Sequence, residues 1–228
     1  MKQELAALAR TSDDDAKERR RDRILREGTT LFLQQGYRKT SVDDIARKAG
    51  IAKGTIYLYF ANKSEILFQA ILDEKRRALG EILPLFARGI RPSDRLRLWI
   101  ELTLRMAQEM PLVARLLRGD HELVAALDEQ PADAMRRGDA LGLDFAAQVI
   151  EEAIAPARLD REALEERAKL VHSLGYFASL LGEERVRQGL SLHRYAALLA
   201  DTIATGLHAA AKGASARRGS SPRKGKTA

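Results

Sequence analysis

Residues 41–60 read SVDDIARKAGIAKGTIYLYF, and the spacing of their small and apolar residues predicts two short helices joined by a tight turn. Ala46 is small enough for a second helix to cross close to the first. Gly50, four residues later, can adopt the left-handed backbone conformation that such a turn needs. Ile56, six residues further on, would then pack the second helix against the first. Many helical hairpins share this spacing, so the outer face of the second helix must decide its role.

That outer face carries residue types suited to DNA. With Ile56 facing inward, Thr55 and Tyr57 lie on either side of it, because a helix turns once in 3.6 residues. Free backbone N–H groups around Lys53 and Gly54 favour phosphate, and glycine allows the backbone to approach DNA closely. A tyrosine hydroxyl can donate to a phosphate oxygen. The alternative is that the tyrosines are partly buried core residues with polar tips.

The longer stretch ILREGTTLFLQQGYRKTSVDDIARKAGIAKGTIYLYFANKSEIL, residues 24–67, resembles the DNA-binding region of TetR-family transcriptional regulators. The resemblance implies base contacts near the start of the second helix and phosphate contacts around it. It departs from the family pattern at Ala52, where a serine is common and could cap the helix, and at Tyr59, where histidine is frequent. The positions implied to contact DNA are Thr40, Ser41, Lys53, Gly54, Thr55, Tyr57, Tyr59 and Lys63.

The remainder of the chain is also predicted to be helical, which makes the fold class all-α. Apolar residues recur at helical spacing in several later segments, and no segment has the alternation typical of a strand. The resemblance implies a three-helix N-terminal DNA-binding domain joined to a larger helical domain for ligand binding and dimerisation. The predicted organisation is a disordered extension over 1–15, a helix-turn-helix domain over 16–65, a helical domain over 66–211 and a disordered basic tail over 212–228.

The charge distribution indicates a polyanionic partner. The net charge is +7, with +5 over residues 1–63, −4 over residues 64–211 and +6 over residues 212–228. Basic ends around an acidic body are typical of a protein that meets nucleic acid with one part of its surface. The tail is expected to add non-specific DNA affinity through counterion release, although a solubilising role would explain its composition equally.

A single helix-turn-helix binds weakly, so a homodimer that contacts a double-stranded DNA operator is expected. We predict that the last two long helices, 164–181 and 192–207, form the dimer interface, although these apolar stripes could also fill the core of one subunit. The resemblance further implies an unidentified small-molecule effector, for which a largely apolar ligand is expected. Side chains that could line its site, each also explicable as ordinary core, are Trp99, Leu102, Met106, Phe145, His172, Tyr176 and Phe177.

Two other classes of protein were weighed against a ligand-released repressor. A ligand-independent architectural DNA-binding protein would rely on the basic tail more than on base contacts. An enzyme is disfavoured, because the four histidines lack metal-ligand spacing and no phosphate-binding loop or nucleophile motif is present. The chain has no cysteine, which excludes disulfides, thiolate metal sites and cysteine nucleophiles, and neither a cofactor nor a metal is expected. The sequence has no membrane-spanning stretch, and a cytoplasmic protein is predicted.

Overall fold

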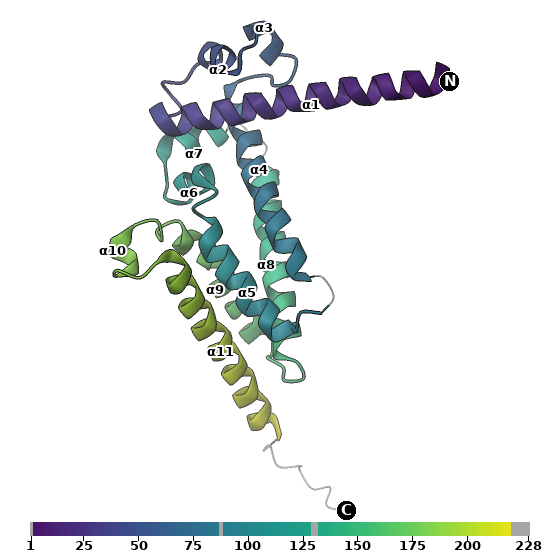
Figure 1. Ribbon diagram of the computed structural model, residues 1–228. Coiled ribbons are helices and arrows are strands. Elements are labelled where there is room, and N and C mark those ends of the chain that lie inside the picture. Colours follow the sequence, from purple (N-terminus) through teal and green to yellow (C-terminus); the bar gives the residue numbers. More distant parts are fainter. Residues whose placement is uncertain (1, 87–88, 129–131, 220–228) are drawn as a thin grey trace, which may run out of the picture. The chain divides into compact units, whose positions relative to one another are not determined.

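The fold is described from a computed structural model, which describes residues 2–86, 89–128 and 132–219 and, within them, the side chains of 14–86, 89–128 and 140–214. Every regular element in these residues is helical, as predicted (Figure 1). The chain divides into two compact units. The N-terminal unit comprises Met1–Arg76 and Met110–Pro131, and the C-terminal unit comprises Arg77–Glu109 and Ala132–Ala228.

The N-terminal unit is built on the predicted helix-turn-helix. Its helices are α1 (Lys2–Gln35), α2 (Val42–Ala49), α3 (Lys53–Ile56), the first part of α4 (Lys63–Ile82), α6 (Pro111–Leu117) and α7 (His121–Leu127). Ala46 and Ile56 are buried at the crossing of α2 and α3. Gly50 ends α2 with φ +64° and ψ +40°, and its N–H donates to the carbonyl of Ala46 or Arg47. The left-handed turn inferred from the sequence is therefore present.

Helix α3 is shorter than the sequence suggests. It begins after Ala52, which provides no side-chain cap, and only Lys53–Ile56 is α-helical. The chain then continues in turns, with the N–H of Leu58 donating to Thr55 and that of Tyr59 donating to Ile56. These turns still bring Phe60 into the core beside Ile56, whose predicted inward position is correct.

Helix α1 and the last helix extend beyond their predicted ends. Helix α1 begins at Lys2, within the stretch that the sequence analysis assigned to a disordered extension. The residues there include several Ala and Leu, which are strong helix formers. Helix α11 reaches Gly219, inside the segment assigned to the basic tail, while residues 220–228 lie outside the described residues.

Helices α6 and α7 belong to the N-terminal unit, whereas the predicted boundary placed them in the larger domain. Arg115 of α6 donates from Nη1 to the carbonyl of Phe32 near the end of α1, over 2.9 Å. Glu122 of α7 accepts from the backbone N–H of Arg38 in the turn that follows, over 3.1 Å. These contacts join segments about 80 residues apart, so no local sequence pattern could have shown them.

The buried carboxylate of Glu74 on α4 fixes the start of α6. Its two oxygens accept from the backbone N–H groups of Leu112 at 3.1 Å and Val113 at 3.0 Å. These two N–H groups belong to the first turn of α6, where no carbonyl of the helix can accept from them. Pro111 precedes them and has no N–H of its own. Glu74 therefore provides the cap that the sequence of α6 lacks.

The C-terminal unit is a bundle of long helices. Its elements are the last part of α4, a 3₁₀ helix (Leu83–Phe86), α5 (Pro92–Met106), α8 (Ala132–Ile154), α9 (Arg161–Ala178), α10 (Glu184–Arg187) and α11 (Leu192–Gly219). Helix α5 packs against α8, α9 and α11. The predicted apolar stripes of the last three long helices supply much of the buried core. Among the helices described, none is long and apolar enough to span a bilayer.

Candidate nucleic-acid interface

The turn from α2 into α3 presents the residues predicted to face DNA. Lys53 and Gly54 are exposed, Tyr57 is 50% exposed, and Ile56 lies directly beneath them with no exposed surface. Thr55 is half-buried at the edge of this surface. A rigid apolar base therefore supports an outward-facing set of polar and aromatic side chains.

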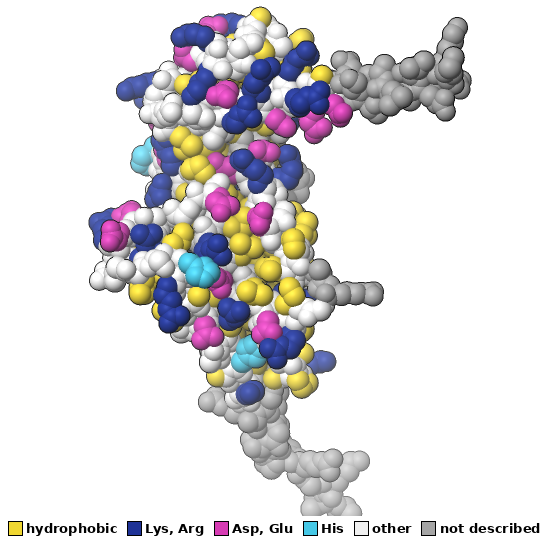
Figure 2. Space-filling model, viewed as in Figure 1, with side chains coloured by type: hydrophobic (Ala, Val, Ile, Leu, Met, Phe, Trp, Pro, Cys, Tyr) yellow, Lys and Arg dark blue, Asp and Glu magenta, His cyan; other side chains and the backbone are white. Residues whose placement is uncertain are grey.

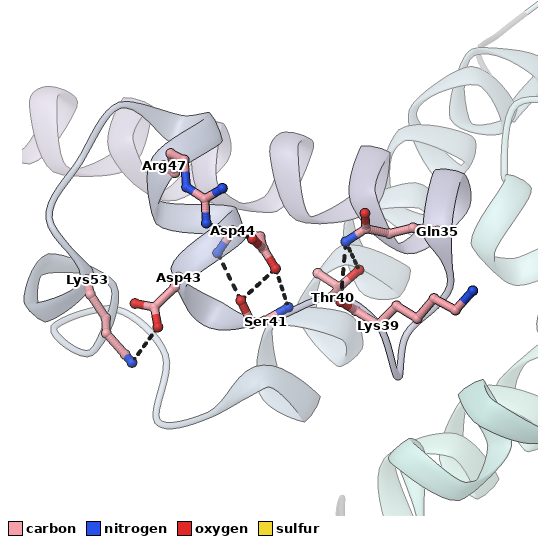
Figure 3. Close-up of polar contacts among 8 residues, drawn as sticks. All are labelled: Gln35, Lys39, Thr40, Ser41, Asp43, Asp44, Arg47 and Lys53. Carbon is pink, nitrogen blue, oxygen red and sulfur yellow. Dashed lines mark hydrogen bonds and ion pairs between the residues drawn. The ribbon is translucent and has the colours of Figure 1, made fainter.

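Lys53 is held by a carboxylate of the preceding helix (Figure 3). Its Nζ lies 2.8 Å from Oδ2 of Asp43 on α2, and both side chains are about half exposed. The hydrogen bond to Asp43, and then the charge of that carboxylate, raise the pKa of Lys53. The ion pair keeps the lysine charged and extended across the gap between α2 and α3.

Ser41 begins α2 with a capping box, as its sequence position predicts. Its Oγ accepts from the N–H of Asp44 and donates to the carboxylate of Asp44 over 2.6 Å. The N–H of Ser41 also donates to that carboxylate, over 3.0 Å. The hydrogen bond from the Ser41 hydroxyl is the main reason that the pKa of Asp44 is lowered. Ser41 is exposed, but its hydroxyl proton is used within the protein (Figure 3).

Two residues expected at phosphates are instead engaged inside the α1–α2 turn. Thr40 is 1% exposed, and its hydroxyl donates to the carbonyl of Gly36 over 2.8 Å. The Nζ of Lys63 donates to the carbonyls of Tyr37 at 2.9 Å and Thr40 at 2.8 Å. It also lies 4.2 Å from the centre of the Tyr37 ring, and burial lowers its pKa. Both side chains stabilise the turn, and their expected phosphate contacts stay a prediction.

Leu58 is an outward residue that the sequence analysis did not include among the contacts. It is 77% exposed and stands next to Tyr57 on the same outer surface. An exposed leucine there is suited to contact the methyl group of a thymine in the major groove. The helical angle from Ile56 already directs it away from the core, and that was the signal available in the sequence.

Comparison with known proteins shows which family has a sequence like that of α2, the turn and α3. The profile described as "Bacterial regulatory proteins, tetR family" matches residues 24–70, which include α2, the turn and α3. The chain therefore carries a DNA-binding region of the TetR family. A TetR/AcrR-family regulator of known structure from Thermobifida fusca has the same fold, with a TM-score of 0.63 and 22% identity over 83% of this chain and 96% of that one.

Two curated relatives match part of the chain. An uncharacterized HTH-type transcriptional regulator of Mycobacterium tuberculosis is 33% identical over 93 residues, which are 41% of this chain and 46% of the relative. The fatty acid metabolism regulator protein of Bacillus subtilis is 32% identical over 100 residues, which are 44% of this chain and 46% of the relative. The chain thus spans less than half the length of these relatives.

The residues expected to line an effector site of this chain are scattered between core and surface. The Trp99 ring packs edge-on against Phe145, with 5.3 Å between the ring centres, and Met106 is buried. Tyr176 is 51% exposed. The remaining three, Leu102, His172 and Phe177, are half-buried.

The structure does not gather these seven side chains around one hollow. His172 lies against α8, where a Cβ added to Gly142 would come within 2.6 Å of its ring. A surface hollow of about 410 Å³ on the C-terminal unit contains none of the seven, and it is lined by Leu143, Asp144, Ala147, Arg161, Leu164, Glu165, Ala168 and Lys169. Their role as ligand contacts therefore stays a prediction.

Two glycines of the TetR-family turn should separate stability from DNA binding. Gly50→Ala is expected to lower the free energy of unfolding by about 1–2 kcal/mol, because alanine is strained at a left-handed position. Gly54→Ala should be neutral or slightly stabilising, since its φ is not positive and an added Cβ would meet no atom of the protein within 4 Å. The same methyl group would keep the backbone of α3 away from DNA.

Thermal denaturation and fluorescence anisotropy with duplex DNA measure the two effects. We expect Gly54→Ala to reduce operator affinity by at least about tenfold with an unchanged melting temperature. We expect Gly50→Ala to melt earlier but to bind with nearly the affinity of the original protein at low temperature. If Gly54→Ala binds DNA with unchanged affinity, the backbone at Gly54 does not approach DNA closely.

Proposed function

We propose that this protein is a sequence-specific transcriptional regulator, a dimeric repressor that leaves a palindromic operator when a small, largely apolar ligand binds. The proposal is carried by one observation, the exposed residues Lys53, Gly54, Tyr57 and Leu58 on a surface supported by buried Ile56. Polar, cationic and apolar tips on one rigid surface are what base edges and flanking phosphates require.

Specific roles follow from where the side chains lie. Lys53, Gly54 and Thr55 face base edges at the start of α3, and Leu58 contacts a thymine methyl group. Tyr57 donates its hydroxyl to a phosphate, and half-buried Tyr59 supports it from the edge of the surface. Ser41 contributes through the start of α2, whereas Thr40 and Lys63 act chiefly by fixing the turn.

Dimerisation through the last two long helices is supported most by α11. Ala196, Ala200 and Ala204 are buried on its inner face, while the opposite face is exposed and uncharged between Leu198 and Ala209, with the exposed Asp201 at its edge. A Cβ added to Gly206 on that face would meet nothing, so a second helix has room to approach. The exposed residues of this uncharged face are Leu198, Thr202, Thr205, Gly206 and Ala209. On α9, Ala178 is buried within the unit, so its contribution would come from Tyr176, together with Leu180 in the turn beyond its end.

Introducing positive charge on the uncharged face of α11 is expected to separate the subunits. The double variant Thr205→Arg with Ala209→Arg would place arginines from both subunits against each other in a poorly solvated interface. Sedimentation velocity should then report a monomer in place of a dimer. The control, Leu79→Arg with Leu83→Arg, adds the same charge at exposed apolar positions elsewhere. A variant that remains dimeric would show that the interface lies on another face.

An apolar effector is supported by the composition of the C-terminal unit and by one relative. Its core is lined by aliphatic residues and by the packed aromatic rings of Phe86, Trp99 and Phe145. The Bacillus subtilis relative is named a fatty acid metabolism regulator. Fatty acids of graded chain length are therefore the first probes for release of the protein from its operator and for a raised melting temperature.

Selection of bound sites from random duplex DNA with the purified protein tests the proposed function. We expect enrichment of a two-fold symmetric site whose half-sites lie about 34–36 Å apart, or further apart if two dimers bind together. A selected pool without a common site would contradict sequence-specific regulation.

A further inference from the structure

Four arginines of α1 form an exposed face that the helix-turn-helix does not use. Arg19, Arg23 and Arg26 follow one another at three- and four-residue spacing, so they share a side of the helix, and Arg20 lies beside them. This side is opposite Ile24 and the other residues that α1 buries. We call Arg19, Arg20, Arg23 and Arg26 the arginine face.

The arginine face is almost free of internal partners. Among the side chains that the structure describes, only Arg26 forms an ion pair, an exposed one with Glu27 at 3.4 Å. The face borders a shallow hollow of about 540 Å³, which is lined by Ala16, Arg19, Arg20, Asp22, Arg23 and Arg26. Residues 16–26 hold six Lys or Arg and two Asp or Glu, a net charge of +4. In the space-filling view, Lys and Arg side chains lie along α1 with Asp or Glu beside them (Figure 2).

Arg21, a neighbouring arginine on the same helix, has a structural role. Arg21 donates to Gln69 of α4 over 2.7 Å and lies 5.7 Å from the centre of the Phe60 ring. Its guanidinium is therefore used to hold α1 against the core. The arginine face lacks such contacts, so packing within the unit does not explain it.

We propose that the arginine face binds the sugar-phosphate backbone of duplex DNA outside the base pairs that α3 reads. It lies in the same compact unit as α3, and its net positive charge complements a phosphate backbone. The face is about 10 Å long, from the helical rise of about 1.5 Å per residue, and the phosphates of one strand advance by about 3.4 Å along the duplex axis, which sets an upper limit on how many it can meet. It therefore meets at most about three phosphates. This inference rests on the proposed function, because it requires an operator held by α3.

Operator length provides the test, using the full chain and the triple variant Arg19→Gln, Arg20→Gln, Arg23→Gln. Affinities are measured by fluorescence anisotropy at several salt concentrations. One duplex ends at the edges of the selected site, and the other extends about one helical turn further on each side. The charge-matched control is Arg91→Gln, Arg158→Gln, Arg185→Gln, which removes three exposed arginines of the C-terminal unit.

On the extended duplex we expect the triple variant to bind roughly tenfold to hundredfold more weakly, with a salt slope smaller by about two to three units. On the trimmed duplex it should bind as the original protein does, and the control should bind both duplexes normally. Equal affinities of variant and original protein on the extended duplex would overturn the inference, as would an equal loss on the trimmed duplex or in the control.

Failure of the proposed function would be seen separately. The original protein would then bind selected and scrambled duplexes alike, before any variant is compared. In that case the salt slopes of the triple variant and of the original protein are compared on long and short random duplexes. Equal slopes for the two proteins would overturn the proposed role of the arginine face.

Discussion

Replacing Glu74 with alanine is expected to lower the free energy of unfolding of the N-terminal unit by about 2–4 kcal/mol. Glu74 is 1% exposed, and its carboxylate accepts from the N–H groups of both Leu112 and Val113. Its removal leaves these donors buried without their acceptor at the start of α6. The loss extends beyond α6, because Arg115 on the same helix holds the carbonyl of Phe32.

Native-state hydrogen exchange is the appropriate measurement, since the single tryptophan, Trp99, lies in the C-terminal unit and does not report on this one. Glu74→Gln retains one acceptor oxygen and should lose about half as much stability. Glu81→Ala makes the same change at an exposed position of α4 and should stay within about 0.5 kcal/mol of the original protein. Protection in Glu74→Ala equal to that in Glu81→Ala would contradict the capping role.

Replacing Lys53 with glutamate is expected to reduce operator affinity on the order of a hundredfold or more. The introduced carboxylate would stand beside Asp43 on the surface that meets DNA, so two negative charges would face the phosphates. Both side chains are about half exposed, so the fold should be retained. Fluorescence anisotropy at fixed salt gives the affinity, and circular dichroism confirms the helical content.

Two variants show whether the effect is local. Lys75→Glu makes the same charge reversal at an exposed position of α4 and should leave operator affinity within about threefold of its original value. Asp43→Asn removes the carboxylate that holds Lys53. It should strengthen binding to every duplex several-fold, because one negative charge no longer repels the phosphates. If Lys53→Glu binds as tightly as Lys75→Glu, Lys53 does not face DNA.

The sequence was sufficient for those parts of the fold that short spacings determine. Ala46, Gly50 and Ile56 occupy the positions predicted for them. The attachment of α6 and α7 could not be predicted, because it depends on Glu74 meeting two N–H groups nearly 40 residues away. A buried glutamate capping a distant helix resembles any solvent-exposed glutamate in sequence.

The candidate site was predicted in part for a similar reason. Lys53 and Gly54 lie at a helix start, and local spacing alone places them outward. Thr40 and Lys63 were expected at phosphates, but the turn between α1 and α2 folds back onto α4 and uses both side chains. Leu58 is not among the predicted contacts, although its helical angle from Ile56 already directs it outward, and the structure shows it exposed.

The ratio of affinities for a selected duplex and a scrambled duplex at physiological salt tests the central claim most directly. An outward α3 that reads base edges predicts a preference of roughly a thousandfold or more. A ratio near one would show that the basic surfaces bind phosphates without reading sequence, as in an architectural DNA-binding protein, and would contradict the account.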